Sequence, residues 1–209
     1  MTSPPAPPPA RQRRTTRATR ARILDAALRE LGRNPDSSLG DIAEAAGVAR
    51  RTVYTHFAGR AALVEGLAEE AAEAIRLAIA VTSAPSPDPA SALARFVLTL
   101  WPVGDSYRAL IGLAGQGLGP AQVRDVLAPA RETVAGILAE GQRRGVFHTA
   151  VPPGPLSGAI EAQLLALLGT VRSGTWADDG TGAATAALIA AGVDRATAAA
   201  TVRRTHRPH

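Results

Sequence analysis

The spacing of apolar side chains is the feature that most constrains the fold of this chain. Between residues 16 and 32, apolar residues recur every three or four positions and charged residues lie between them. This spacing is typical of an amphipathic helix. Alanine and leucine dominate the rest, whereas only seven of the 209 residues are aromatic. Because alanine and leucine lose little freedom on entering a helix, we expect an all-α fold.

Two short helices follow the first one. Residues 34–37, NPDS, end the first helix, and Ser38 followed by Asp41 has the spacing of a capping box that opens a helix over residues 39–46. Gly47 ends this helix, and another is expected over residues 49–57. The pattern predicts a tri-helical helix-turn-helix, and Ala58-Gly59 separates it from a longer helix over residues 60–81.

The remaining sequence predicts further helices with a linker before them. The linker is SAPSPDP at residues 83–89, and Pro102 is expected to break the chain between two of the helices. The predicted helices cover residues 89–100, 107–115, 120–144, 155–172, 182–191 and 195–204.

Four segments follow from this pattern. They are a disordered arm rich in proline and arginine at 1–15, the helix-turn-helix domain at 16–60, a larger helical domain at 61–204, and a flexible tail at 205–209. The arm is either a solvated leader or a segment that lies in a minor groove.

Positive charge is concentrated at one end of the chain. Residues 1–60 contain eleven arginines and five acidic residues, whereas residues 61–209 contain twelve arginines and thirteen acidic residues. A basic module joined to a nearly neutral one suits a polyanionic partner, because neutralising phosphates releases counterions. Charge alone describes a solvated basic tail equally well.

The helix expected at residues 49–57 has the pattern of a DNA-reading helix. Val53 and Phe57 share a face with Ala49, and this apolar face seats the helix on the preceding one. Its other side is polar, as in a helix that enters the major groove. The candidate DNA-binding residues are Ser38, Arg50, Arg51, Thr52, Tyr54, Thr55, His56 and Arg60.

These residues have different expected roles. Arg50 and Arg51 lie in the first turn and have the reach to pair with guanine, and Thr52 contacts either a thymine methyl group or a phosphate. Tyr54 and His56 each donate one hydrogen bond to a phosphate, which sets position and not sequence. No second histidine or carboxylate is spaced to make His56 a metal ligand or a catalytic base.

Two further residues are expected to grip the DNA backbone. Arg60, with the free amides at the start of the next helix, is expected to bind phosphate. Ser38 either caps its helix or also donates its hydroxyl to a phosphate.

The stretch ILDAALREL, followed by SSLGDIAEAAGVARRTVYTHFAGRAALVEGL, resembles the DNA-binding domain of TetR-family regulators. That family has the pattern IAxxAGV, a turn, T-aliphatic-Y-x-H-F, a basic residue and an apolar pair. The resemblance implies that Thr52, Tyr54, His56 and Arg60 lie at the DNA surface. Ala49 stands where the family often has serine, and Gly40 stands where some members place a side chain that reaches DNA. The matching residues are Ile42, Ala43, Ala46, Gly47, Val48, Thr52, Val53, Tyr54, His56, Phe57, Arg60 and Leu63.

The resemblance also implies a helical C-terminal domain that dimerises and encloses a small-molecule pocket. The helix expected at residues 155–172 is apolar nearly all round, so it is covered on both sides, either by a second subunit or as a central core helix. A two-fold dimer also suits two recognition helices about 34 Å apart in successive major grooves. The candidate dimer-interface residues are Leu156, Ile160, Leu164, Leu168, Val171 and Leu188.

The pocket candidates are mostly aromatic residues outside the reading helix. Aromatic residues at helical spacing are also common in ordinary cores, so both interpretations stay open. No charged cluster accompanies them, which favours an apolar or weakly polar ligand. The candidates are Phe96, Trp101, Tyr107, Phe147, Gln163 and Leu167.

Several functions are disfavoured by the sequence. There is no cysteine for a thiol nucleophile or zinc cluster, and GLAGQGLG lacks the pattern of a phosphate loop. We therefore expect no enzyme, no cofactor and no metal. The start of the chain lacks a signal-peptide core, and the apolar stretch at 155–171 is short for a bilayer and contains Glu161 and Gln163, so a cytoplasmic location without a membrane is expected.

Together these features predict a homodimeric transcriptional regulator. Its expected partners are a palindromic double-stranded DNA operator and a small-molecule effector that releases a repressor from it. The alternative is an architectural DNA-binding protein without an effector.

Overall fold

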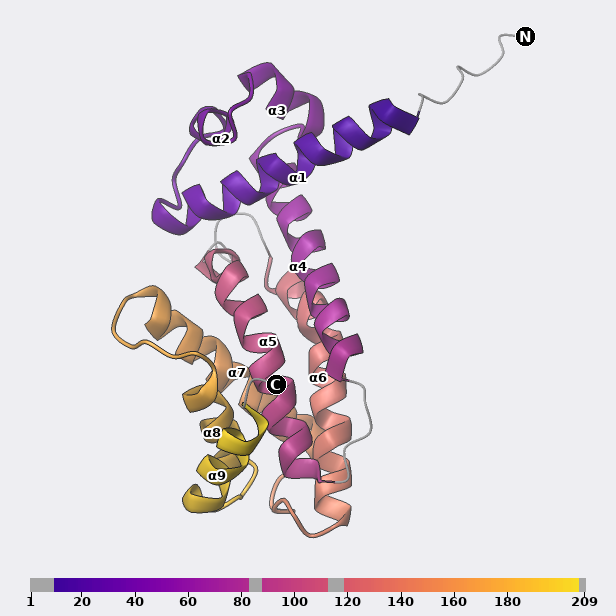
Figure 1. Ribbon diagram of the computed structural model, residues 1–209, viewed down its shortest axis with the longest axis vertical. Helices are drawn as coiled ribbons and strands as arrows, with labels where there is room; N and C mark the ends of the chain where they lie inside the picture. Colours follow the sequence, from indigo (N-terminus) through magenta and orange to yellow (C-terminus); the bar gives the residue numbers. More distant parts are fainter. Residues whose placement is uncertain (1–9, 83–87, 113–118, 207–209) are drawn as a thin grey trace, which may run out of the picture. The chain divides into compact units, whose positions relative to one another are not determined.

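The computed structural model describes residues 10–82, 88–112 and 119–206, and in these the regular structure is entirely helical (Figure 1). The chain divides into two compact units, Met1–Leu67 and Ala68–His209. The helices are α1 (Ala10–Arg33), α2 (Leu39–Ala45), α3 (Arg50–His56), α4 (Arg60–Thr82), α5 (Pro89–Gly112), α6 (Pro120–Arg143), α7 (Pro153–Arg172), α8 (Thr181–Ala190) and α9 (Arg195–Thr205).

Helix α1 is longer than the sequence pattern indicated. It begins at Ala10, so residues 10–15 are helical, and the prediction that they belong to an extended arm was wrong. The last of the clustered prolines is Pro9, and the alanine, arginine and glutamine that follow have good helix propensity. The rest of the predicted arm, residues 1–9, lies outside the described residues.

The first unit is built around the predicted apolar stripe of α1. In Figure 1, α2 and α3 lie together on one side of α1, and short turns join the three helices. The cationic group of Arg20 lies 5.3 Å from the centre of the Phe57 ring, at the end of α3. The core of this unit consists of buried residues from all three helices and the start of α4: Ile23, Leu24, Ala27, Leu31, Ile42, Val53, Phe57 and Leu63.

In the second unit, α5 is one continuous helix, and the predicted break at Pro102 was wrong. A proline inside a helix removes one backbone donor and disfavours the preceding turn. Packing outweighs this cost, because Phe96, Trp101 and Leu110 on either side of the proline are all buried. The Ser106 hydroxyl also donates a hydrogen bond of 2.8 Å to the Pro102 carbonyl.

The core of the second unit lies between α5 and the helices around it. Helices α8 and α9 pack against α5, and α6 pairs with α7 (Figure 1). Small side chains let α8 approach α5 closely, since Ala183, Ala184 and Ala187 are fully buried. One described helix, α7, is long and apolar enough to cross a membrane by length and composition, and 22% of its most apolar stretch is buried in the chain.

Candidate DNA-binding face and effector cavity

Helix α2 begins with the predicted capping box, which the structure confirms. Ser38 Oγ accepts hydrogen bonds of 3.2 Å from the backbone N–H groups of Gly40 and Asp41. In return, Asp41 Oδ2 accepts one of 2.8 Å from the Ser38 N–H. Hydrogen bonds to its carboxylate from the Ser38 backbone and side chain lower the pKa of Asp41. Ser38 stays exposed, but its hydroxyl interacts with the Asp41 carboxylate, so the predicted phosphate contact has to compete with this cap.

The turn from α2 to α3 depends on Gly47. Its φ of 62° lies in the left-handed region, where glycine carries no side-chain penalty. Ala49 then precedes α3 without a side-chain cap, which agrees with the departure noted at this position in the sequence. The α3 N-terminus therefore presents uncapped backbone N–H groups.

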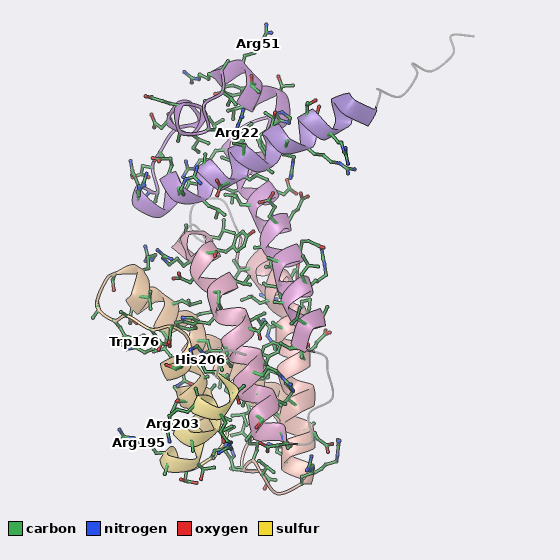
Figure 2. All side chains as sticks on the ribbon, in the orientation of Figure 1. Arg22, Arg51, Trp176, Arg195, Arg203 and His206 are labelled. Carbon is green, nitrogen blue, oxygen red and sulfur yellow. The ribbon has the colours of Figure 1, made fainter. Side chains whose placement is uncertain are left out.

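Helix α3 is seated by the two predicted apolar residues. Val53 is fully buried and Phe57 is 2% exposed. Arg51 extends away from α1 and α2 (Figure 2), and Tyr54 is 47% exposed. Of the other predicted DNA contacts on this helix, Arg50 and Thr55 are exposed, and Thr52 and His56 are partly exposed.

Two contacts within α3 organise this exposed face. The Arg50 guanidinium carbon lies 5.8 Å from the centre of the Tyr54 ring, one helical turn away. The Thr55 hydroxyl donates a hydrogen bond of 2.9 Å to the Arg51 carbonyl. Thr55 therefore offers its methyl group and an oxygen lone pair, and it does not offer a donor to phosphate in this rotamer.

Arg60 has a role that the sequence did not reveal. Its Nη1 donates a hydrogen bond of 2.7 Å to the Ser37 carbonyl, and its Nη2 donates to the Pro35 carbonyl. The guanidinium thus connects the first residue of α4 to the loop before α2. The predicted phosphate contact has to compete with these two hydrogen bonds. No local sequence pattern marks this contact, because its partners lie 23 and 25 residues away.

A cavity of about 160 Å³ lies within the second unit, between α4, α5, α6 and α7. Phe96, Trp101 and Tyr107, three of the predicted pocket residues, line it. Phe147 does not, because it is a buried core residue packed directly on Gly141. Gln163 and Leu167 on α7 are likewise not among the lining residues.

The cavity wall contains an ion pair that the sequence analysis missed. Arg131 on α6 donates hydrogen bonds of 3.0 and 2.8 Å from Nε and Nη2 to the Glu161 carboxylate on α7. The hydrogen bond with Glu161 raises the pKa of Arg131. The pair adds two charged side chains to a wall for which the sequence indicated no charged cluster. The two residues lie thirty positions apart, so no short-range spacing pairs them.

The predicted dimer-interface stripe mostly faces the chain's own core. Leu156, Ile160 and Leu168 are at most 5% exposed, and Leu188 on α8 is fully buried. A side chain buried within one chain offers no surface to a second, so these four assignments were wrong. Leu164 and Val171 are partly exposed, and Leu164 also lines the cavity. The exposed side of α7 carries small residues instead: Ala159, Ala162 and Ala166.

No group of three histidine, cysteine or acidic side chains in the described parts of the chain is arranged to hold a metal ion. The chemistry available on the first unit is that of an exposed basic and hydroxyl-bearing helix. The first unit has the features of the helix-turn-helix class of DNA-binding regulators. They are a short capped helix, a turn at a glycine, and an exposed polar helix that two apolar residues anchor to the core.

The first unit contains a segment that is similar to known proteins. Residues 23–67 match the model of the bacterial regulatory proteins of the tetR family. The HTH-type transcriptional repressor LfrR of Mycolicibacterium smegmatis is 47% identical over 68 residues, which are 32% of this chain and 33% of the repressor. The match thus spans about a third of that relative's length. Residues 23–67 are therefore similar to the bacterial regulatory proteins of the tetR family, and this segment contains α2, α3 and the start of α4.

Solved structures extend the likeness in fold to the second unit. A gamma-butyrolactone receptor, described as an ArpA-like protein, has a TM-score of 0.71 and 20% identity, with 91% of this chain and 98% of the receptor covered. RolR in complex with resorcinol has a TM-score of 0.59 and 24% identity, with 93% and 96% covered. At these identities the comparison concerns the fold alone.

Proposed function

We propose that this chain is a homodimeric, cytoplasmic repressor that binds a palindromic operator and leaves it when a small molecule binds. The observation that carries the proposal is the geometry of α3. The buried side chains of Val53 and Phe57 anchor the helix to the core of the first unit. Arg50 and Arg51 remain exposed in its first turn. An exposed arginine at this position has the reach to pair with the O6 and N7 atoms of guanine in the major groove.

The surroundings of α3 suit the phosphate backbone. Tyr54 and His56 present hydrogen-bond donors beside the reading arginines, and Ser38 lies exposed at the start of α2. Arg22 projects from α1 (Figure 2), and the first sixty residues contain six more arginines than acidic residues. This excess supplies the long-range attraction to a polyanion.

The proposed dimer forms through the exposed side of α7. This helix is apolar, but its own chain covers only one side of it. Alanines at 159, 162 and 166 recur at the spacing of one helix face and leave room for close approach of another helix. A second copy with its α7 antiparallel across a two-fold axis would cover this face.

The effector is proposed to bind in the cavity of the second unit. RolR was solved with resorcinol, and the ArpA-like protein is named as a gamma-butyrolactone receptor, so small organic molecules bind relatives of this fold. A ligand that favours a dimer conformation unable to match the groove spacing lowers operator affinity by shifting the population.

The test begins with the purified chain and a library of random DNA duplexes. We expect retention that falls with salt and a palindromic sequence among the selected fragments. The matched variants are Arg51→Ala and Arg195→Ala, since both arginines are exposed and Arg195 lies on α9. Arg51→Ala should change the selected sequence and Arg195→Ala should not. Absence of retention at low salt, or equal effects of both variants, would contradict the proposal.

An architectural protein without an effector differs in one measurable way. Its operator affinity is the same in the presence of every small molecule that the second unit binds. Release of DNA by a bound molecule therefore separates the two functions.

A further inference from the structure

We infer that the cavity takes an uncharged, mostly apolar molecule with a core about one aromatic ring in size and one polar group that hydrogen-bonds to Tyr107. The inference rests on the proposed effector-binding function and specifies the chemical class of the ligand. Its basis is the shape and chemistry of the cavity wall in the second unit.

The volume sets the size of the ligand core. The cavity measures about 160 Å³. An apolar protein cavity of about 150 Å³ is large enough to bind benzene. A single ring with a short substituent therefore fills this space, whereas a large multi-ring molecule requires the surrounding helices to move apart.

The wall gives an apolar ligand contacts on all sides. The cavity is surrounded by small aliphatic residues of α4, aromatic residues of α5, and branched aliphatic residues of α6 and α7. The indole N–H of Trp101 is not available to a ligand, because it donates a hydrogen bond of 3.1 Å to the Asp178 carbonyl. Representative lining residues are Ala71, Ile75, Phe96, Val134, Ile160 and Leu164.

The only opposite charges in the described wall are already paired with each other. Arg131 and Glu161 form a two-point hydrogen-bonded ion pair, with side chains 28% and 23% exposed. An anionic ligand has to displace Glu161 from Arg131, and a cationic ligand has to displace Arg131 from Glu161. Each exchange leaves one partly buried charge without its partner, which is costly. The pair therefore disfavours ligands of either charge.

Tyr107 supplies the polar contact. Its side chain is partly buried in the wall, and its hydroxyl makes no hydrogen bond with a described residue. Burial, and then the negative charge of Glu70 on α4, raise the pKa of Tyr107. The phenol thus stays protonated at neutral pH and can donate to a carbonyl or ether oxygen.

The experiment uses four probes that share one ring and differ in their substituent. They are ethylbenzene, acetophenone, phenylacetate and 2-phenylethylammonium, titrated calorimetrically into the full chain at neutral pH. We expect acetophenone to bind most tightly, and both charged probes to bind at least about tenfold more weakly than acetophenone. On the same preparations, retention of selected DNA is measured separately.

Two variants locate the binding. Tyr107→Phe should weaken acetophenone about fivefold and leave ethylbenzene unchanged, because only acetophenone accepts a hydrogen bond. Ala130→Leu, which places a larger side chain in the cavity wall, should weaken both probes without lowering the unfolding temperature. A merely structural role for Tyr107 would change the affinities of both probes equally.

Three results would overturn the inference. They are a charged probe that binds as tightly as acetophenone, a Tyr107→Phe variant that binds acetophenone normally, and no binding of any probe at millimolar concentration. Each leaves the DNA-binding role standing if salt-sensitive retention persists. If the chain does not retain DNA but binds the four probes in the expected order, the repressor proposal is rejected and the inferred chemical class of the ligand stands.

Discussion

Arg60 Nη1 donates a hydrogen bond of 2.7 Å to the carbonyl oxygen of Ser37, the residue immediately before the N-cap of α2. Ser37 is 4% exposed, so this carbonyl lies in a largely buried residue. Through this contact and the one to Pro35, the start of α4 holds the entry to the helix-turn-helix. Arg60 is therefore a positioning residue for α2.

Replacing Arg60 tests this positioning role. We expect Arg60→Ala to lower the free energy of unfolding by about 1–3 kcal/mol, because two backbone acceptors lose a charged donor. Urea unfolding of the purified chain measures the change. Arg29→Ala is the matched control, since Arg29 pairs with Asp25 on the exposed side of α1, and it should cost less than about 1 kcal/mol.

Arg60 as a direct phosphate ligand gives a different result. In that case Arg60→Ala leaves the unfolding free energy unchanged and reduces the dependence of DNA affinity on salt by roughly one phosphate contact. The unfolding free energy and the salt dependence of DNA affinity, both measured on Arg60→Ala, therefore distinguish a positioning role from a phosphate contact.

Tyr54 tests the phosphate contacts of the reading helix. Tyr54→Phe removes one hydroxyl from an exposed ring. It should weaken binding to all duplexes alike, by about 1 kcal/mol, while the ranking of sequences stays the same. Competition binding with selected and scrambled duplexes measures both properties. A changed ranking would mean that Tyr54 reads a base.

The outcomes at α3 and α5 show which parts of the fold are readable from sequence. The capping box, Gly47 and the Val53–Phe57 seat were predicted because each depends on residues within a few positions of one another. Pro102 was misinterpreted because a proline lowers helix propensity locally, whereas burial of distant partners around α5 determines the outcome.

The functional residues that sequence reasoning missed depend on long-range contacts. Periodicity predicted that Leu156, Ile160 and Leu168 share a face of α7, but it does not say whether that face meets its own chain or another. The Arg131–Glu161 pair joins two helices and has no local signal. Both features become visible only when the helices are placed in space.

A substitution at Arg51 tests directly whether this residue recognises a base. Its side chain extends from α3 with no hydrogen bond from its guanidinium to a described residue (Figure 2). Arg51→Ala should cost about 1–3 kcal/mol on the selected operator and relax preference at one base pair in each half-site. Selection from a random library with the variant measures the preference. An unchanged consensus with uniformly weaker binding would assign Arg51 to phosphate.

The capping box predicts an acid-dependent stability of the first unit. Hydrogen bonds from the Ser38 backbone and hydroxyl hold the pKa of Asp41 below its ordinary value of 3.8. Because the folded pKa is the lower one, the stabilisation is complete above the unfolded pKa and is lost as the pH falls through the folded pKa. Asp41→Asn should flatten the loss of stability as the pH falls below about 5.

Thermal unfolding across this acidic range measures the slope for each variant. Asp36→Asn is the control, because Asp36 is an exposed residue in the preceding loop and lies outside the capping box. Equal slopes for the wild type and Asp41→Asn would show that the Asp41 cap does not contribute to acid unfolding.

The exposed alanines of α7 give the sharpest test of the proposed dimer. Ala162→Glu places a carboxylate in the middle of this face, and in a two-fold interface each substitution occurs twice. Burying these charges without partners should convert the dimer to monomers in sedimentation velocity experiments and weaken operator binding, because the two half-sites are no longer bound by one particle. Ala196→Glu on α9 is the matched control, since Ala196 is also exposed and its substitution should preserve the dimer. A dimer that survives Ala162→Glu and the neighbouring Ala166→Glu would place the subunit contact on another surface, and the recognition helices would then require a different two-fold axis.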